Sequence, residues 1–206
     1  MSEISRPALV LASSSRYRRE LLERLRVPFG VERPDVDEAA LPGEEARTTA
    51  ERLARAKAEA VGAHHRHALV IGSDQVASWR GQHIGKPGTH ARALEQLVQF
   101  QGETVIFYSA LCVLDCQSGR RLAAVAPVRV RFRSLATSEL DAYLRMDEPY
   151  DCAGSAKSEG LGITLMESIE SDDPTALVGL PLIRLVSMLR DLGYALPAPR
   201  APGSGR

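Results

Sequence analysis

Short apolar runs alternate with amphipathic segments along this chain of 206 residues. Residues 8–12 (ALVLA) and 68–72 (ALVIG) are predicted to be buried β-strands, because each is a continuous apolar run of strand length. Residues 17–26 and 46–65 place leucine or alanine along one face and charges around the rest, which predicts two amphipathic helices. The first third of the chain therefore predicts a strand, two helices and a second strand.

The rest of the chain is dominated by two long strand candidates. Residues 103–135 contain both, joined by a glycine-containing turn near residues 118–120. Strict alternation within residues 128–133 (VRVRFR) predicts one buried face and one face of arginines. Other segments predict a hairpin that turns at Arg80 and Gly81, a helix over 89–100 with Thr89 as its cap, a capped helix over 137–146 and an apolar closing helix over 178–194.

This order of elements favours a single α/β domain over residues 1–196. Helices separate the early strands, long antiparallel strands follow, and neither an internal repeat nor a linker interrupts the pattern. We expect a mixed, twisted sheet with helices packed around it. Residues 197–206 (PAPRAPGSGR) are rich in proline, glycine and arginine, a composition typical of a disordered tail.

Composition and charge narrow the class of protein. Lys and Arg together number 26, as do Asp and Glu, so the net charge of zero provides no general attraction to nucleic acid or to an anionic membrane. No apolar run approaches the roughly 18 residues of a membrane-spanning helix, and the N-terminus lacks the pattern of a signal peptide. Three cysteines without C-x-x-C spacing fit a reducing compartment. We therefore expect a cytoplasmic protein that binds neither nucleic acid nor membrane directly.

A run of serines and arginines follows the first strand, where a helix is predicted to begin. Ser13, Ser15 and Arg18 belong to this run, in which hydroxyls, guanidinium groups and the positive end of the helix dipole converge. Such a combination can hold phosphates, although the glycines and the Gly-Lys-Ser/Thr ending of a Walker loop are absent. Helix capping by serine with surface arginines is an equally good interpretation of this segment alone.

Carboxylates provide the second candidate chemistry. The loop PDVDE contains Asp35, Asp37 and Glu38, and Asp74 stands at the end of the strand predicted over residues 68–72. Carboxylates brought together from separate segments could bind Mg²⁺ or Mn²⁺ and bridge them to phosphates. For PDVDE alone a solvated acidic loop is the simpler interpretation, whereas a strand end is where α/β folds commonly position catalytic groups.

Two further features have mainly structural interpretations. His64, His65 and His67 follow a predicted helix end, where exposed cations at the helix C-terminus are a better explanation than a metal site. Cys152 could be a nucleophile only with a histidine from upstream, because none follows it in the chain.

A set of motifs in fixed order resembles the Maf family of nucleoside triphosphate pyrophosphatases. LASSSRYRRELL, PDVDE, RLARAKA, IGSDQV, GKP, AGSAKSEG and DPTALVGLPL occur in family order between about residues 9 and 192. The resemblance implies an α/β fold of the Maf/inosine triphosphatase type, with two lobes around a cleft. It also implies hydrolysis between the α and β phosphates of a nucleoside triphosphate, which yields a monophosphate and pyrophosphate.

The resemblance also implies roles for individual residues. The family's essential acid/base matches Asp74, and its acidic loop residue matches Glu38, so these two carboxylates would hold a divalent cation such as Mg²⁺, Mn²⁺ or Co²⁺. Lys57 and Lys86, which are undistinguished alone, become expected phosphate ligands. The complete set of matched phosphate-binding positions is Ser13, Ser15, Arg18, Lys57 and Lys86.

Substrate choice in the family follows three positions, occupied here by Tyr17, Gln75 and Glu159. SDQ and AGSAKSEG resemble the 7-methyl-GTP pyrophosphatase branch, a house-cleaning enzyme, and differ from the SPRR, ADT and IQG of the branch that takes dTTP and UTP. An aromatic ring can stack on a cationic methylated purine, and a carboxylate can accept hydrogen bonds from guanine. This branch usually has Pro-Trp where the chain has Arg16 and Tyr17.

Three functions therefore remain open from the sequence. The first is hydrolysis of 7-methyl-GTP, and the second is hydrolysis of dTTP or UTP on the same fold. The third is a nucleotide-binding regulator of cell division or septum formation, a role with which the family has been associated. The sequence also leaves a homodimer open.

Overall fold

The computed structural model describes residues 6–197. Its strands are β1 (Ala8–Ala12), β2 (Gly30–Glu32), β3 (Ala68–Trp79), β4 (Gln82–Ile84), β5 (Thr104–Asp115), β6 (Arg121–Phe132) and β7 (Met166–Glu170). Its helices are α1 (Arg16–Glu23), α2 (Ala46–Gly62), α3 (His90–Phe100), α4 (Thr137–Asp147) and α5 (Leu182–Asp191), with 3-10 turns η1 (Ala153–Ser155), η2 (Leu161–Leu165) and η3 (Ala176–Val178). The tail predicted over 197–206 lies, apart from its first residue, outside the described residues.

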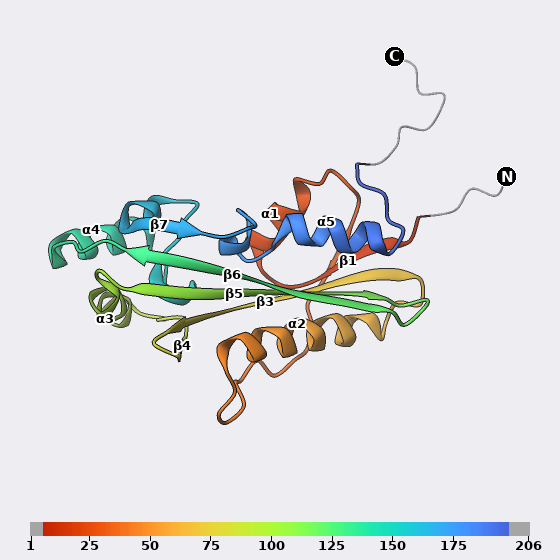
Figure 1. Cartoon of the computed structure of the whole chain (residues 1–206), viewed down its shortest axis with the longest axis horizontal. Coiled ribbons are helices and arrows are strands. Elements are labelled where there is room, and N and C mark those ends of the chain that lie inside the picture. The colour runs from red at the N-terminus through yellow and green to blue at the C-terminus, as the bar shows by residue number, and fades with distance from the viewer. Residues whose placement is uncertain (1–5, 198–206) are drawn as a thin grey trace, which may run out of the picture.

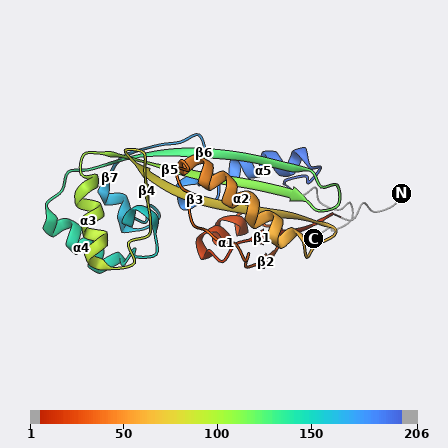
Figure 2. The same cartoon turned by 90° about the horizontal axis from the view of Figure 1, so that it is seen from below.

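A single mixed sheet organises the molecule, as predicted. Its strand order is β2-β1-β3-β5-β6-β7, with β4 paired to β3; β1 runs parallel to β2 and β3, and the other pairs are antiparallel. Figure 1 shows an elongated body in which α2 lies on one face of the sheet and α1 and α5 on the other. Helices α3 and α4 lie together at one end of the long axis, as Figure 2 also shows from below, away from α1, α2 and α5.

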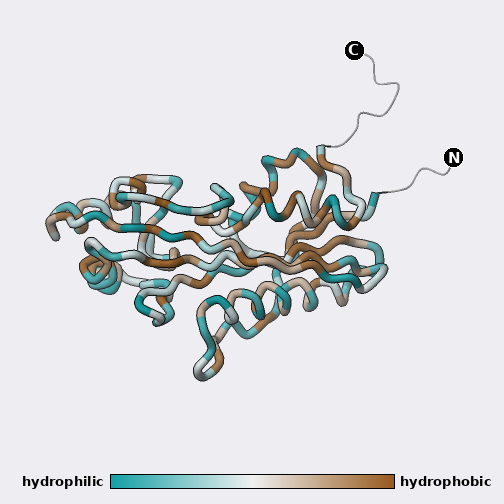
Figure 3. The backbone as a smooth tube through the Cα atoms, in the orientation of Figure 1, coloured by the Kyte–Doolittle hydropathy of each residue, from teal (hydrophilic) through white to brown (hydrophobic). Residues whose placement is uncertain are grey.

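Three apolar clusters hold these layers together. One lies between the sheet and α1 and α5, a second between the sheet and α2, and the third among α3, α4 and the far halves of β5 and β6. Apolar residues accordingly concentrate along the central strands in Figure 3, while polar residues dominate the loops. Two clusters at one end and one at the other correspond to the two lobes that the resemblance implied.

Helix α2 packs unusually close to the sheet because small residues face each other. Ala50, Ala54 and Ala58 are fully buried along one face of α2. Opposite them on β3 is Gly72, where an added Cβ would lie 2.1 Å from the carbonyl oxygen of Ala54 and 2.7 Å from the amide nitrogen of Ala58. Only a glycine fits this contact, and it brings α2 directly against the strand that carries Asp74.

Several predicted elements agree with the structure in their bounds. β1 covers the predicted residues 8–12, the hairpin turns at Arg80 and Gly81, and the Thr89 hydroxyl caps α3 by accepting from the amide of Arg92. α1 ends at Glu23, three residues earlier than predicted, and Arg26 adopts a positive φ of 52° that leaves the helical region.

The prediction that a strand ends just before Asp74 is wrong. β3 continues to Trp79, and β5 pairs with it from Leu69 to Ser78, so long-range hydrogen bonds extend the strand through the polar residues Ser73 to Gln75. Asp74 therefore lies inside a 12-residue strand. Its nearest strand end belongs to β1, which stops at the residue paired with Gly72.

A notch in the sheet replaces the expected strand end. β1 pairs with β3 as far as Gly72, and β4 begins to pair at Ala77. Within the described part of the chain, residues 73–76 of β3 therefore have no strand on this side. Because side chains alternate across a strand, Asp74 faces α2 as Gly72 does, whereas Gln75 faces the side of α1 and α5. Asp74 and Gln75, although adjacent in the chain, therefore point to opposite faces of the sheet at this notch.

The loop before α2 is organised around Glu44. Its carboxylate accepts hydrogen bonds from Arg52 Nε and Nη2, each at 2.8 Å, from Thr49 Oγ1 at 2.9 Å and from the amide of Leu41 at 3.1 Å. These contacts, with those of Arg52 the largest, lower the pKa of Glu44 from 4.5 to about 2. A depressed folded-state pKa contributes stability that is present above the ordinary pKa and is lost as the pH falls through the folded value.

We expect Glu44→Gln to lower the urea midpoint of unfolding at neutral pH. The difference from the wild type should shrink as the pH falls from 4.5 toward about 2, because both carboxyl and amide are then neutral. Urea titrations across this range measure it. The matched control is Glu45→Gln at the adjacent exposed position, and an equal pH dependence in both variants would contradict the role of Glu44.

None of the helices within residues 6–197 combines the length and the apolar character needed to cross a bilayer.

Candidate active site

A cavity of about 940 Å³ opens at the notch in the sheet. Its wall comes from the β1–α1 turn, the acidic loop, α2, β3, the turn after β4, the loop after α4 and η3. The ten residues to which the family resemblance gave a role all line it: Ser13, Ser15, Tyr17, Arg18, Glu38, Lys57, Asp74, Gln75, Lys86 and Glu159. Segments far apart in the chain thus meet at one site.

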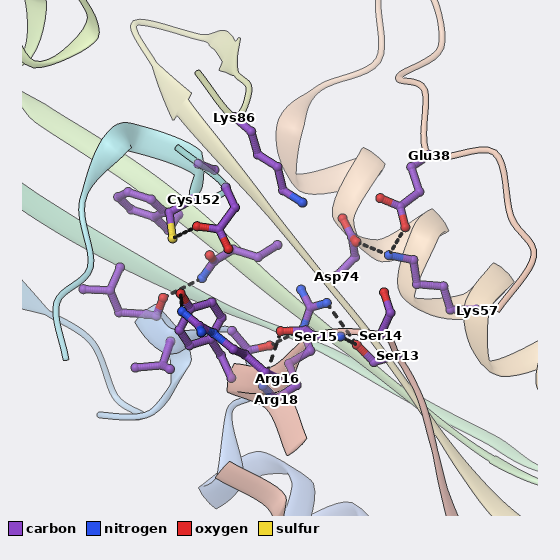
Figure 4. Close-up of a pocket in the computed structure, with 18 of the residues that line it drawn as sticks. Ser13, Ser14, Ser15, Arg16, Arg18, Glu38, Lys57, Asp74, Lys86 and Cys152 are labelled. Atoms are coloured by element: carbon purple, nitrogen blue, oxygen red, sulfur yellow. Dashed lines mark hydrogen bonds and ion pairs between the residues drawn. The ribbon is translucent and has the colours of Figure 1, made fainter. Parts of the chain in front are cut away.

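Asp74, Lys57 and Glu38 form a compact group on the α2 face of the notch. Lys57 Nζ lies 2.6 Å from Asp74 Oδ1 and 2.7 Å from Glu38 Oε1. The side chains of Lys57 and Asp74 are only 5% and 9% exposed, whereas that of Glu38 is 61% exposed. Figure 4 shows the ammonium group between the two carboxylates and Lys86 reaching toward them from the other side.

This arrangement adds a role to the one expected for Lys57. An ammonium group has three protons, and two of them are directed at carboxylates, so one remains for a phosphate. Burial raises the pKa of Glu38, but the hydrogen bond and charge of Lys57 outweigh it, helped by Lys86 and Arg18, and the net pKa lies below its ordinary value. The cations thus keep Glu38 ionised, with one carboxylate oxygen of each acid bound to Lys57.

The serine run both caps a helix and lines the cavity, so the two interpretations left open by the sequence are compatible. Ser15 is the N-cap of α1 and its hydroxyl accepts from the amide of Arg18 at 3.4 Å. The Ser13 hydroxyl accepts from the amide of Ser15 at 3.1 Å. Both residues therefore stand at the positive end of a helix dipole that faces the cavity, which favours anions.

Arg18 is fixed at two points. Its Nε donates to the carbonyl of Gly179 at 3.0 Å and its Nη1 to Ser13 Oγ at 3.5 Å. Burial lowers the pKa of Arg18, while the charges of Asp74 and Glu38 act in the opposite direction. A guanidinium remains protonated in such surroundings, so Arg18 is a fixed positive charge in the cavity wall.

The other half of the cavity has a more apolar wall. Phe107, Met166, Leu177 and Val178 line it together with Tyr17, Gln75 and Glu159. The Arg16 guanidinium lies 4.7 Å from the centre of the Tyr17 ring, and its Nη2 donates to the Tyr17 hydroxyl at 2.8 Å. A cation therefore already stacks on the aromatic ring expected to contact the base.

Gln75, which was expected to help choose the substrate, is hydrogen-bonded to the protein itself. Its amide nitrogen donates to Ser109 Oγ at 2.8 Å, to the carbonyl of Leu177 at 2.9 Å and to that of Ala176 at 3.1 Å. These bonds take up the donors of the amide. Sequence reasoning missed Ser109, Phe107 and Met166, because nothing in their local sequence differs from ordinary strand positions. Leu177 and Val178 lie in the motif DPTALVGLPL, but sequence reasoning assigned no role to them individually.

The other candidates have structural roles or none in the site. Burial raises the pKa of the Cys152 thiol to about 12, which leaves it protonated and unsuited to nucleophilic attack, although it lies in the cavity wall. His64 and His65 contact opposite oxygens of the Glu32 carboxylate at 2.7 and 2.8 Å. They link the end of α2 to β2, and the His64 side chain is 69% exposed, in agreement with the expected exposed position after the helix end.

The carboxylates of this site suit a hard divalent cation such as Mg²⁺ only if a bound substrate provides further oxygen ligands. Among residues 6–197 no group of three or more histidine, cysteine, aspartate or glutamate side chains could hold a metal ion. Asp74 and Glu38 each use one oxygen on Lys57 and keep the other. Mg²⁺ is commonly bound by one or two carboxylates, with substrate phosphates and waters completing its six oxygen ligands. Two carboxylates beside a cavity lined by Arg18, Lys57 and Lys86 fit that mode.

Comparison with known proteins agrees with this geometry. The family model described as "Maf-like protein" matches residues 8–192. A protein named 7-methyl-GTP pyrophosphatase from Cupriavidus metallidurans is 61% identical over 194 residues, which cover 94% of this chain and 98% of that protein. Proteins of the same name from Burkholderia pseudomallei strain 1710b and Polaromonas sp. are 62% and 59% identical, covering 97% of this chain in both cases and 95% and 91% of their own lengths.

Proposed function

Because this chain belongs to the Maf family, we propose that it is a 7-methyl-GTP pyrophosphatase, a hydrolase that converts this nucleotide to 7-methyl-GMP and pyrophosphate. Identity of about 60% to relatives of that name over nearly the whole chain carries the assignment of the substrate. The meeting of two carboxylates with Lys57, Arg18 and Lys86 in one cavity supports the reaction.

Hydrolysis of the α–β anhydride needs a base for water and cations for the phosphates. We assign the role of base to Asp74, which is held in place by Lys57 at 2.6 Å and faces the cavity from a rigid central strand. As water attacks phosphorus, its proton passes to the carboxylate and the pyrophosphate group leaves. The Asp74 oxygen that is not bound to Lys57 has two lone pairs, so it can accept the proton of the attacking water and also contribute to a bound cation.

The positive groups stabilise charge that grows on the phosphates. Arg18 and Lys86 face the cavity from opposite sides, and the Ser13 and Ser15 hydroxyls lie at the N-terminus of α1. Lys57 has two roles, because it holds one oxygen of each carboxylate and also presents its third proton to a phosphate oxygen. Preorganised donors of this kind stabilise a transition state without reorganisation during the reaction.

A divalent cation, Mg²⁺, Mn²⁺ or Co²⁺, would be held by Glu38 and Asp74 together with phosphate oxygens. When bound, it supplies neutralisation of phosphate charge and orientation of the anhydride. Lys57 holds one oxygen of each acid and so turns both side chains toward the same point of the cavity. The chain's own residues thus prepare the carboxylates before the substrate arrives.

Removal of divalent cations is expected to abolish pyrophosphate release. Since the two carboxylates alone provide few ligands, a chelator should strip the ion readily, and adding Mg²⁺, Mn²⁺ or Co²⁺ in excess should restore the rate. Rates before and after chelation measure this, with a melting curve as the control for an intact fold. Full activity in the presence of chelator would contradict the assignment of Glu38 and Asp74 as metal ligands.

We propose that Tyr17 and Glu159 contact the base. A methylated guanine carries a positive charge that an aromatic ring attracts, and Glu159 can accept hydrogen bonds from the guanine N1–H and amino group. Tyr17→Arg combined with Glu159→Gln is therefore expected to lower the rate on 7-methyl-GTP relative to dTTP and UTP. Parallel kinetics on the three nucleotides measure the ratio. An unchanged ratio would remove these residues from base recognition.

The decisive test of the proposed function is a panel of modified and unmodified nucleoside triphosphates, assayed for pyrophosphate and orthophosphate. We expect pyrophosphate, with 7-methyl-GTP the preferred substrate. Orthophosphate as the main product would overturn the reaction, and preference for dTTP or UTP would overturn the substrate. Tight nucleotide retention without turnover would favour a regulator of cell division instead.

A cytoplasmic location is proposed on the ground that the cysteines Cys112, Cys116 and Cys152 are free thiols.

A further inference from the structure

Two buried serines on the sheet hold one short segment of the cavity wall. Ser73 on β3 and Ser109 on β5 are both 0% exposed. Their hydroxyls donate to backbone carbonyls of residues 176–179, which contain η3 and which we call the wall segment. A hydroxyl in the middle of a sheet is costly to bury unless it is hydrogen-bonded, and apolar residues would serve a purely structural sheet better.

Ser109 holds the first half of the wall segment. Its hydroxyl donates to the carbonyl of Ala176 at 2.6 Å and accepts from the amide nitrogen of Gln75 at 2.8 Å. Gln75 lies directly opposite Ser109 in the ladder between β3 and β5. The same amide donates to the carbonyl of Leu177, a residue that lines the apolar half of the cavity. Ser109 and Gln75 therefore fix the part of the wall expected to contact the base.

Ser73 holds the second half. Its hydroxyl donates to the carbonyl of Gly179 at 2.9 Å and also lies 2.9 Å from the carbonyl of Ala110. The Gly179 carbonyl accepts Arg18 Nε as well, at 3.0 Å. Gly179 has a φ of 108°, a conformation that favours glycine and turns this carbonyl back toward the sheet. Ser73 thus acts on the residue that anchors the guanidinium of Arg18.

We propose that Ser109 and Ser73 are positioning residues with separable roles in the proposed reaction. Ser109, with Gln75, sets the wall beneath the base and so contributes to nucleotide selection. Ser73, through the Gly179 carbonyl, sets the guanidinium of Arg18 toward the phosphates that leave as pyrophosphate. The inference rests on the proposed function, and it gives Gln75, whose amide nitrogen bonds to protein, an indirect route to the base through the wall segment.

The test compares Ser73→Ala, Ser109→Ala and the control Ser78→Ala. Ser78 lies on the same strand as Ser73, is 8% exposed and stands outside the cavity wall. Pyrophosphate affinity is measured by calorimetry, and kcat and KM are measured on 7-methyl-GTP, GTP and UTP. Ser73→Ala should weaken pyrophosphate binding and raise KM on all three nucleotides by a common factor of about three to ten, the loss typical of one hydrogen bond.

Ser109→Ala should give the opposite pattern. Pyrophosphate affinity should stay at the wild-type value, while the preference in kcat/KM for 7-methyl-GTP over UTP should fall by about three- to tenfold. Ser78→Ala should change neither quantity. Melting curves accompany each variant, and Ser109→Cys, with its weak donor, takes the place of Ser109→Ala if that variant does not fold.

Two outcomes would overturn the inference. One is a lower melting temperature in both Ser73→Ala and Ser109→Ala, with unchanged pyrophosphate affinity and unchanged kcat/KM preference between nucleotides. This result would mean that the two serines have a structural role only. The other is the same kinetic change in both, which would remove the separation of roles. Turnover by the wild-type protein tests the proposed function separately. Absence of pyrophosphate release from 7-methyl-GTP would overturn the proposed reaction. The calorimetric comparison of Ser73→Ala and Ser109→Ala would still test the inference.

Discussion

Asp74→Asn is expected to lower the rate of pyrophosphate release from 7-methyl-GTP by about 10²- to 10⁴-fold, the usual contribution of a general base. The amide keeps an oxygen that can accept from Lys57, whose nitrogen lies 2.6 Å from Asp74 Oδ1, so the fold should survive. What disappears is the negative charge that takes a proton from water and attracts the divalent cation. The rate with saturating metal and nucleotide, measured for both proteins, gives the effect.

The matched control for this variant is Asp172→Asn. The Asp172 side chain is 96% exposed and stands outside the cavity wall, so the same chemical change there should leave the rate unaltered. Melting temperatures of all three proteins separate a lost base from a lost fold. Substantial activity in a well-folded Asp74→Asn protein would show that another group activates the water.

The sequence predicted which residues meet better than it predicted how they meet. The ordered motifs placed all ten candidate residues around one cavity, and the mixed α/β sheet is confirmed. Local patterns misplaced the end of the strand at Asp74, since the hydrogen bonds that extend β3 come from β5, which is distant in the sequence. Apolar periodicity reports burial of a segment, but it does not report which strand pairs with which.

The partners of the Lys57 and Gln75 side chains also could not be predicted from local sequence patterns. Helix periodicity places Lys57 on the same face as buried alanines, which was a signal that this lysine is not a solvated one. Its position between two carboxylates depends on the packing of α2 against β3 and on the path of the acidic loop. Gln75 likewise acquires its partners from residues 109, 176 and 177, and no local pattern connects these segments.

The close packing of α2 against Gly72 of β3 leaves no room for a side chain at residue 72. Gly72→Ala is expected to lower the free energy of unfolding by about 3 kcal/mol, near the upper end for an overpacked core. The added Cβ would stand 2.1 Å from the carbonyl oxygen of Ala54 and 2.7 Å from the amide of Ala58, and backbone atoms cannot rotate away as a flexible side chain can. Helix α2 must therefore shift, and Lys57 shifts with it.

Activity should fall together with stability in this variant, because a displaced Lys57 no longer bridges Asp74 and Glu38 at 2.6 and 2.7 Å. Urea unfolding and pyrophosphate release, both measured where the variant is still folded, test the two effects. The control is Gly30→Ala, also in a strand, where the added Cβ meets its nearest atoms at an ordinary 3.9 Å and should change stability by less than about 0.5 kcal/mol. A folded Gly72→Ala protein with wild-type activity would mean that the contact between α2 and β3 tolerates a shift without moving Lys57, and the coupling between this packing and the catalytic group would be refuted.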